Sequence, residues 1–137
     1  MKNKFIFLIL LLLFSTLITG NAREDHPSIN PNKIVVQKNS REIDTLRYFR
    51  TVSDNDKIRE VIEVLEKATW ENAEAEMISP PHYAFYFDEN DSEIYKLWIS
   101  PNKDKIELVA EGYAQLTKEA STQLFKIMTD QKLTDVQ

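Results

Sequence analysis

Three short runs of aromatic and aliphatic residues, separated by polar turns, constrain most strongly how this chain can fold. The runs cover residues 83–87, 94–99 and 106–110, and a fourth, shorter run follows at 113–116. The turns between them are built from Asp, Asn, Ser, Pro and Gly, the residues typical of hairpin connections. Because strands joined by such short turns pair antiparallel, the pattern predicts a meander of about four strands.

Alternation along these strands assigns side chains to the two faces of the sheet, since successive side chains of a strand point to opposite faces. The face predicted to meet the core carries Tyr83, Phe85, Phe87, Tyr95, Leu97, Ile99, Ile106, Leu108 and Ala110. The opposite face carries Ala84, Tyr86, Ile94, Lys96, Trp98, Glu107 and Val109. Trp98 is therefore predicted to point away from the core.

Two amphipathic segments are predicted to be helices. Ser53 or Asp54 can cap the first helix, and Thr117 can cap the last one. Apolar side chains recur every three or four residues along both segments, namely Ile58, Val61, Ile62, Leu65 and Ala68 in the first and Ala120, Leu124, Ile127 and Met128 in the last. Packing both helices on one side of the sheet buries all of these apolar faces.

Two extended stretches precede the first helix. Residues 34–36 form a β-branched run, residues 37–41 a polar turn, and residues 45–52 a second extended stretch. The predicted fold class is therefore α+β. It consists of an antiparallel sheet, a meander of about four strands plus these N-terminal strands, with two helices packed on one face.

The first twenty-two residues have the pattern of a secretory signal peptide. Residues 1–4 are basic, Phe5 to Ile18 form an uncharged and largely apolar run, and Gly20-Asn21-Ala22 provides small residues at a cleavage site. The apolar run is short for a membrane span, which needs ~20 such residues. We expect the chain to be exported and cut after Ala22. If it is not cut, residues 5–18 would be its membrane contact.

Residues 17–20, Leu-Ile-Thr-Gly, resemble the lead-in to a bacterial lipoprotein cysteine, but Asn21 follows and the chain has no cysteine. No lipid can therefore be attached through a thioether, and we expect a protein that is secreted or at the cell surface without lipidation. Residues 23–32 are polar and contain two prolines, which predicts a disordered leader. The remainder, residues 33–137, is predicted to be a single domain.

The charge of the chain argues against nucleic acid as a partner. The formal net charge is −5, and it becomes −7 when Lys2 and Lys4 are removed with the signal peptide. An acidic domain repels phosphate backbones. The lack of cysteine also removes disulfides and thiol chemistry from consideration.

The region that follows the predicted leader resembles the YhfM-like domain. The resemblance rests on Ile94-Tyr95-Lys96-Leu97-Trp98-Ile99, on Tyr113-Ala114-Gln115-Leu116-Thr117-Lys118-Glu119, and on Leu124 and Ile127 of the closing helix. It covers roughly residues 33–133. The resemblance implies an α+β protein of the cell envelope in Bacillus-type bacteria, and it carries no activity and no functional residues. Many members would place a lipidated cysteine where this chain has Asn21.

No motif for a cofactor, a metal or a catalytic triad is found. Residues 88–93, Asp-Glu-Asn-Asp-Ser-Glu, resemble the opening of a calcium loop, but Glu93 stands where glycine is needed and Ile99 where a bidentate carboxylate is needed. The two histidines, His26 and His82, cannot form a metal triad, and His82 is interpreted as a turn residue before a strand. We expect no catalytic residues, no cofactor and no metal.

The outer face of the sheet is the predicted binding surface. Tyr86, Ile94, Trp98, Val109 and Tyr113 would lie on neighbouring strands there. Aromatic residues gathered on a solvent face are typical of recognition surfaces, although the N-terminal strands or residues 70–78 could cover them instead.

We therefore expect a non-enzymatic binding module whose partner is an envelope protein or a cell-wall component. Two alternatives stay open, a small secreted hydrolase that uses paired carboxylates and an inhibitor or protective protein for another exported protein.

Overall fold

The computed structural model describes residues 31–73, 75–88 and 93–137. The elements in chain order are β1 (Ile34–Ser40), β2 (Thr45–Val52), α2 (Asn55–Lys67), β3 (Tyr83–Phe87), β4 (Tyr95–Ile99), β5 (Ile106–Val109), β6 (Tyr113–Gln115), α3 (Lys118–Thr129) and the 3-10 helix η1 (Leu133–Asp135). The predicted signal peptide and residues 23–30 of the predicted leader lie outside the described residues. Within the described ranges, no helix has the length and apolarity needed to span a membrane.

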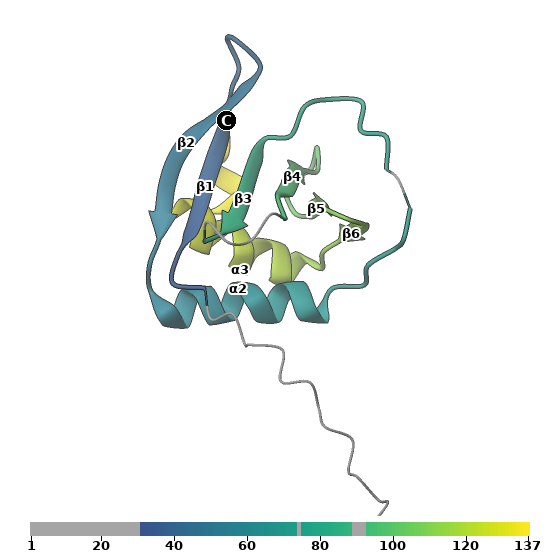
Figure 1. Ribbon diagram of the computed structural model, residues 1–137. Coiled ribbons are helices and arrows are strands. Elements are labelled where there is room, and N and C mark those ends of the chain that lie inside the picture. The colour runs from purple at the N-terminus through teal and green to yellow at the C-terminus, as the bar shows by residue number, and fades with distance from the viewer. Residues whose placement is uncertain (1–30, 74, 89–92) are drawn as a thin grey trace, which may run out of the picture. The chain divides into compact units, whose positions relative to one another are not determined.

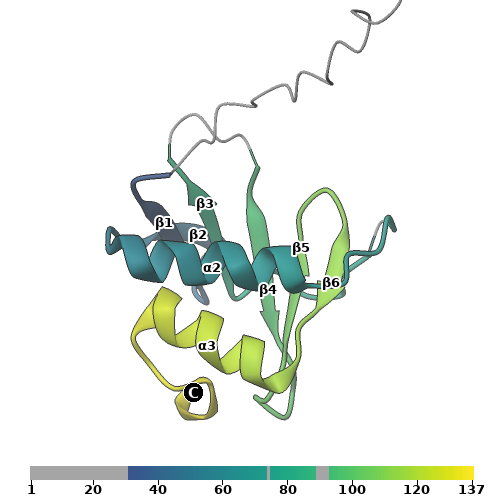
Figure 2. The same cartoon turned by 90° about the horizontal axis from the view of Figure 1, so that it is seen from below.

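Within these ranges, six strands form one open antiparallel sheet in the order β2-β1-β3-β4-β5-β6. The predicted meander is confirmed as β3 to β6, and the N-terminal hairpin joins it because β1 pairs with β3, with Val36 opposite Phe85. Helices α2 and α3 both lie on one face of this sheet (Figures 1 and 2). The predicted α+β class with two helices on one face is therefore confirmed.

The core lies between the two helices and one face of the sheet. This is the face that the alternation of side chains predicted to meet the core. The buried strand residues of this core are Ile34, Val36, Val52, Tyr83, Phe85, Phe87, Leu97, Ile106 and Leu108. From the helices come Ile58, Val61, Val64, Leu65, Leu124, Phe125, Ile127 and Met128. Phe125 was absent from the predicted apolar face, yet it is fully buried and its ring meets the Tyr83 ring edge-on, with centroids 5.7 Å apart.

Both predicted helix caps are confirmed. The Asp54 carboxylate accepts a hydrogen bond from the backbone N–H of Asp56 at 2.9 Å, and the Thr117 hydroxyl accepts one from the N–H of Ala120 at 3.2 Å. These bonds satisfy N–H groups that have no partner within the first turn of a helix.

Strand β1 is longer than the sequence predicted. The turn expected at residues 37–41 is instead strand up to Ser40, because β1 is hydrogen-bonded to a neighbour on each side as far as Lys38. Polar side chains do not by themselves favour a strand, but backbone pairing with both flanking strands holds these residues in the extended conformation.

A β-bulge interrupts the regular alternation of side chains along β2. Val36 lies opposite Arg50 whereas Gln37 lies opposite Tyr48, so Phe49 is the extra residue of the bulged strand. Bulges re-aim side chains at sheet edges, and here Phe49 packs against the core.

Ser121 joins α3 to the sheet through a buried hydrogen bond. Its side chain is fully buried, and its hydroxyl oxygen accepts a bond from the N–H of Ile106 at 2.8 Å. Ile106 begins β5, so this bond fixes the strand's first residue against the helix.

His82 ties three strands together just before β3 begins. Its backbone N–H donates to the Leu97 carbonyl, its carbonyl accepts from the Asn39 N–H, and its Nδ1 accepts from the Ile99 N–H at 3.0 Å. Burial lowers the pKa of this imidazole below 6.5, and the positive charge of Arg41 lowers it further. The neutral ring is thus the form that the fold uses.

We predict that Ser121→Ala lowers the free energy of unfolding by about 1–3 kcal/mol, because the Ile106 N–H is left buried without an acceptor. Urea unfolding of the variant and of Thr122→Ala, an exposed neighbour on the same helix, measures the difference. Equal stability of the two variants would contradict this role for Ser121.

We predict that the free energy of unfolding falls as the pH is lowered through 6.5, the pKa of an unperturbed histidine. The folded protein holds His82 at a lowered pKa, so below pH 6.5 the unfolded state binds more protons and gains stability. Urea unfolding at about pH 7.5 and about pH 5.5 measures this loss. His82→Asn keeps a side-chain acceptor but does not titrate, and its stability should depend less on pH. An unchanged pH dependence would contradict the prediction.

Candidate functional site

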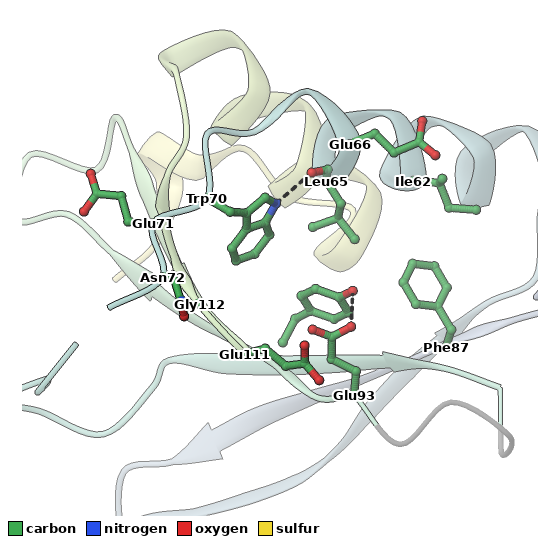
Figure 3. Close-up of a pocket in the computed structure, with 11 residues that line it drawn as sticks. Ile62, Leu65, Glu66, Trp70, Glu71, Asn72, Phe87, Glu93, Glu111 and Gly112 are labelled. Atoms are coloured by element: carbon green, nitrogen blue, oxygen red, sulfur yellow. Dashed lines mark hydrogen bonds between the residues drawn. The ribbon is translucent and has the colours of Figure 1, made fainter. Parts of the chain in front are cut away.

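A pocket of about 500 Å³ opens at one end of the interface between α2 and the sheet (Figure 3). Its walls come from the second half of α2, the start of the α2–β3 connection, the facing ends of β3 and β4, and the β5–β6 turn. The lining residues are Ile62, Leu65, Glu66, Trp70, Glu71, Asn72, Phe87, Glu93, Tyr95, Glu111 and Gly112. A cavity of this size suits a small molecule or a single large side chain.

Aromatic rings held in fixed orientations form one wall of this end pocket. The Trp70 indole Nε1–H donates to the Leu65 carbonyl at 2.9 Å, which fixes the indole against the end of α2. The Tyr95 ring lies 6.2 Å from the Trp70 ring between centroids and stacks on Phe85 at 5.0 Å. Phe87 meets Tyr95 edge-on at 6.1 Å. This wall therefore presents aromatic surface that cannot reorient easily.

The remainder of the pocket is acidic. Four glutamates line it, and the described residues of its lining include no Lys, Arg or His. Figure 3 shows Glu93 and Glu111 on the sheet side, whereas the carboxylates of Glu66 and Glu71 point away from the space enclosed. Glu93 also accepts a hydrogen bond from the Tyr95 hydroxyl at 2.9 Å. The concentration of like charge gives the pocket a negative potential.

A pair of backbone hydrogen bonds holds the connection against the sheet at this end. The Glu71 N–H donates to the Tyr113 carbonyl at 2.8 Å, and the Tyr113 N–H donates to the Glu71 carbonyl at 3.0 Å. A Cβ atom on Gly112 would lie 2.7 Å from the Glu71 carbonyl oxygen, which is too close. The absence of a side chain at position 112 thus permits this close approach.

Trp98 lies where alternation placed it, but it is not an accessible residue. Its neighbour Leu97 belongs to the core under the helices, and Trp98 points to the other face, where its side chain is only 7 % exposed. Its Nε1–H donates to the Ser79 carbonyl at 2.7 Å. The α2–β3 connection passes round to this face (Figure 1), and its Ser79 is the residue that meets the indole. Of the two alternatives left open for Trp98, exposure on the outer face and cover by another segment, the structure shows cover.

The other four predicted binding residues keep some accessibility. Ile94 is 47 % exposed, while Tyr86, Val109 and Tyr113 are half-buried. The Tyr113 hydroxyl donates to Glu107 at 2.7 Å, and this bond, with burial and the nearby negative charges, raises the pKa of Tyr113 to about 12. None of these residues lines the end pocket. That they contact a partner stays a prediction.

The calcium-like sequence at 88–93 is described only at Asp88 and Glu93, and residues 89–92 lie outside the described ranges. Among the residues that the structure describes, no group of three or more His, Asp or Glu side chains is arranged to hold a metal ion.

The sequence interpretation did not find the end pocket, because its lining comes from five separate segments of the chain. Trp70 enters the sequence interpretation only within residues 70–78, the segment that could cover the outer face. Two single-residue signals were present, a tryptophan directly beyond a helix end and Gly112, the only glycine after the signal peptide.

The described part of the chain is thus an α+β domain with an open six-stranded sheet, two helices on one face and an acidic, aromatic-walled pocket at one end. The full chain matches the family model described as YhfM protein over residues 28–134, and it belongs to that family. No curated protein and no solved structure matches it. The family description names no activity, ligand or partner.

We predict that Gly112→Ala lowers the free energy of unfolding by about 1–3 kcal/mol and loosens the wall of the end pocket, because the new methyl group pushes the Glu71 carbonyl away from Tyr113. Hydrogen exchange of the Glu71 and Tyr113 amides, together with urea unfolding, measures both effects. Glu111→Ala, an exposed change in the same turn, is the control. Unchanged protection of these two amides in Gly112→Ala would contradict the steric explanation.

Proposed function

We propose that this protein is an exported, non-enzymatic binding module of the cell envelope whose end pocket binds an organic cation carrying an apolar chain. The observation that supports the proposal is the combination in one cavity of an aromatic wall with the carboxylates of Glu93 and Glu111, in a lining whose described residues include no basic side chain. Export rests on the signal-peptide pattern of residues 1–22.

The two parts of the pocket favour the two parts of such a ligand. An ammonium or guanidinium group gains from the negative potential and from the faces of aromatic rings, which attract cations. An apolar chain attached to it would be buried against Ile62, Trp70 and Phe87. An anion would be repelled, and a neutral chain would gain only the apolar contacts.

A basic side chain of an envelope protein and a free small amine share this chemistry. Both are consistent with the partner expected from the sequence, an envelope protein or a cell-wall component. Nucleic acid and anionic lipid head groups are unsuited to this pocket because they carry the same sign of charge as its glutamates.

A small hydrolase is the second candidate, and it is favoured by the presence of Glu93 and Glu111 in the same cavity. Two carboxylates acting on either side of a scissile bond are the usual machinery for sugar hydrolysis. One oxygen of Glu93 already accepts the Tyr95 hydroxyl, so this carboxylate has a structural role as well. Hydrolysis of a glycoside that is lost in Glu93→Gln would favour this candidate over simple binding.

We predict that n-hexylammonium shifts the indole N–H resonance of Trp70 in a proton–nitrogen NMR titration. The chain has two tryptophans, so Trp98, which does not line the pocket, is an internal control. Hexanoate and hexanol, which have the same chain with a negative or no charge, should shift Trp70 much less. Equal shifts with all three ligands would contradict recognition of the charge, and no shift with any of them would contradict a binding pocket.

The double variant Glu93→Gln, Glu111→Gln should bind n-hexylammonium roughly fivefold to thirtyfold more weakly, since two partly exposed charges are removed. Glutamine keeps an acceptor for the Tyr95 hydroxyl, so the fold is preserved. The double variant Glu42→Gln, Glu119→Gln changes the net charge equally at exposed positions outside the pocket lining and should leave the affinity unchanged.

A further inference from the structure

The β1–β2 hairpin carries positive charge in an acidic protein. Residues 34–52 contain the basic side chains Lys38, Arg41, Arg47 and Arg50 against the acidic Glu42 and Asp44, whereas the whole chain has a net charge of −5. Figure 1 shows this hairpin at one side of the sheet, with its tip extending beyond β3. The hairpin therefore differs in charge from the remainder of the molecule.

Strand β2 is also an edge of the sheet. It pairs with β1 on one side, and no strand among the described residues pairs with it on the other. An edge strand presents backbone N–H and C=O groups that an incoming extended chain can use. We call this unpaired side the β2 edge, formed by residues 45–52.

Two like charges lie directly across the hairpin at this edge. Lys38 is the register partner of Arg47, and like charges in that position repel. The Lys38 ammonium lies over the rings of Phe49 and Tyr83, at 5.7 and 5.8 Å from their centroids. None of the ion pairs found among the described residues includes Lys38 or Arg47. A carboxylate placed here would relieve the repulsion.

The next residue presents a different surface. Tyr48 is 68 % exposed, and because it follows Arg47 its ring points to the opposite face of the hairpin. A strand paired with β2 would therefore meet a positive charge on one face and an apolar ring on the other. The matching partner alternates acidic and apolar side chains.

We propose that the β2 edge binds an acidic, extended peptide segment by strand addition, with a carboxylate near Arg47 and an apolar side chain near Tyr48. A second copy of this chain is a poor partner, because two antiparallel β2 strands would bring Arg47 of one copy close to Arg50 of the other. Charges and a bulge also protect sheet edges from pairing, and that purely protective role is the alternative which the experiment must exclude.

The test uses a capped peptide that alternates Glu and Val and is about as long as β2. Calorimetric titration should detect binding that weakens as salt is added. Hydrogen exchange should show new protection of those backbone amides at residues 45–48 that point away from β1. A peptide alternating Glu and Pro has the same charge, but the fixed φ of proline keeps it out of the extended strand conformation, and it should neither bind as tightly nor protect these amides.

Arg47→Glu separates recognition from folding. It turns the repulsive pair with Lys38 into an attractive one, so the melting temperature should stay or rise, while affinity for the Glu–Val peptide falls by about tenfold or more. Arg59→Glu makes the same change of charge on an exposed part of α2 and should leave the affinity unchanged. The proposal is overturned if the Glu–Val peptide does not bind, if the Glu–Pro peptide binds equally, or if Arg47→Glu has no effect.

Discussion

The connection between α2 and β3 is the constraint on which the remainder of the structure depends. α2 ends beside β6, whereas β3 lies in the middle of the sheet, and the connection between them passes round to the face that the helices leave open (Figure 1). Its first part is held to β6 by the two bonds between Glu71 and Tyr113, and its last part accepts the Trp98 indole at Ser79. The same segment therefore builds a wall of the end pocket and removes Trp98 from solvent.

Most of the fold could be predicted from local patterns. Alternation from Tyr83 to Leu108 identified the buried face, and the caps at Asp54 and Thr117 set the helix starts, because these signals depend on neighbours within a few residues. The length of β1 and the bulge at Phe49 could not be predicted in this way. Both depend on pairing with strands elsewhere in the chain, and pairing partners overrule local preference.

The candidate site was harder to predict for a related physical reason. The solvent accessibility of a side chain depends on which other segments pack over it. Alternation along a strand predicts only the face to which that side chain points. Trp98 points as predicted but is covered, while Trp70, which no periodic pattern includes, forms part of the pocket. Gly112 could have been a clue, because a single glycine beside a strand often marks a close approach of two backbones.

The pairing of Glu71 with Tyr113 has a consequence for stoichiometry. At that point it occupies the rim of the sheet beyond β6, so within the described part of the chain the two lateral rims of the sheet are unequal. Copies of this chain could therefore join by strand pairing at one rim only. Polymerisation would need a second free rim to propagate, and this asymmetry disfavours fibres and favours complexes of fixed size.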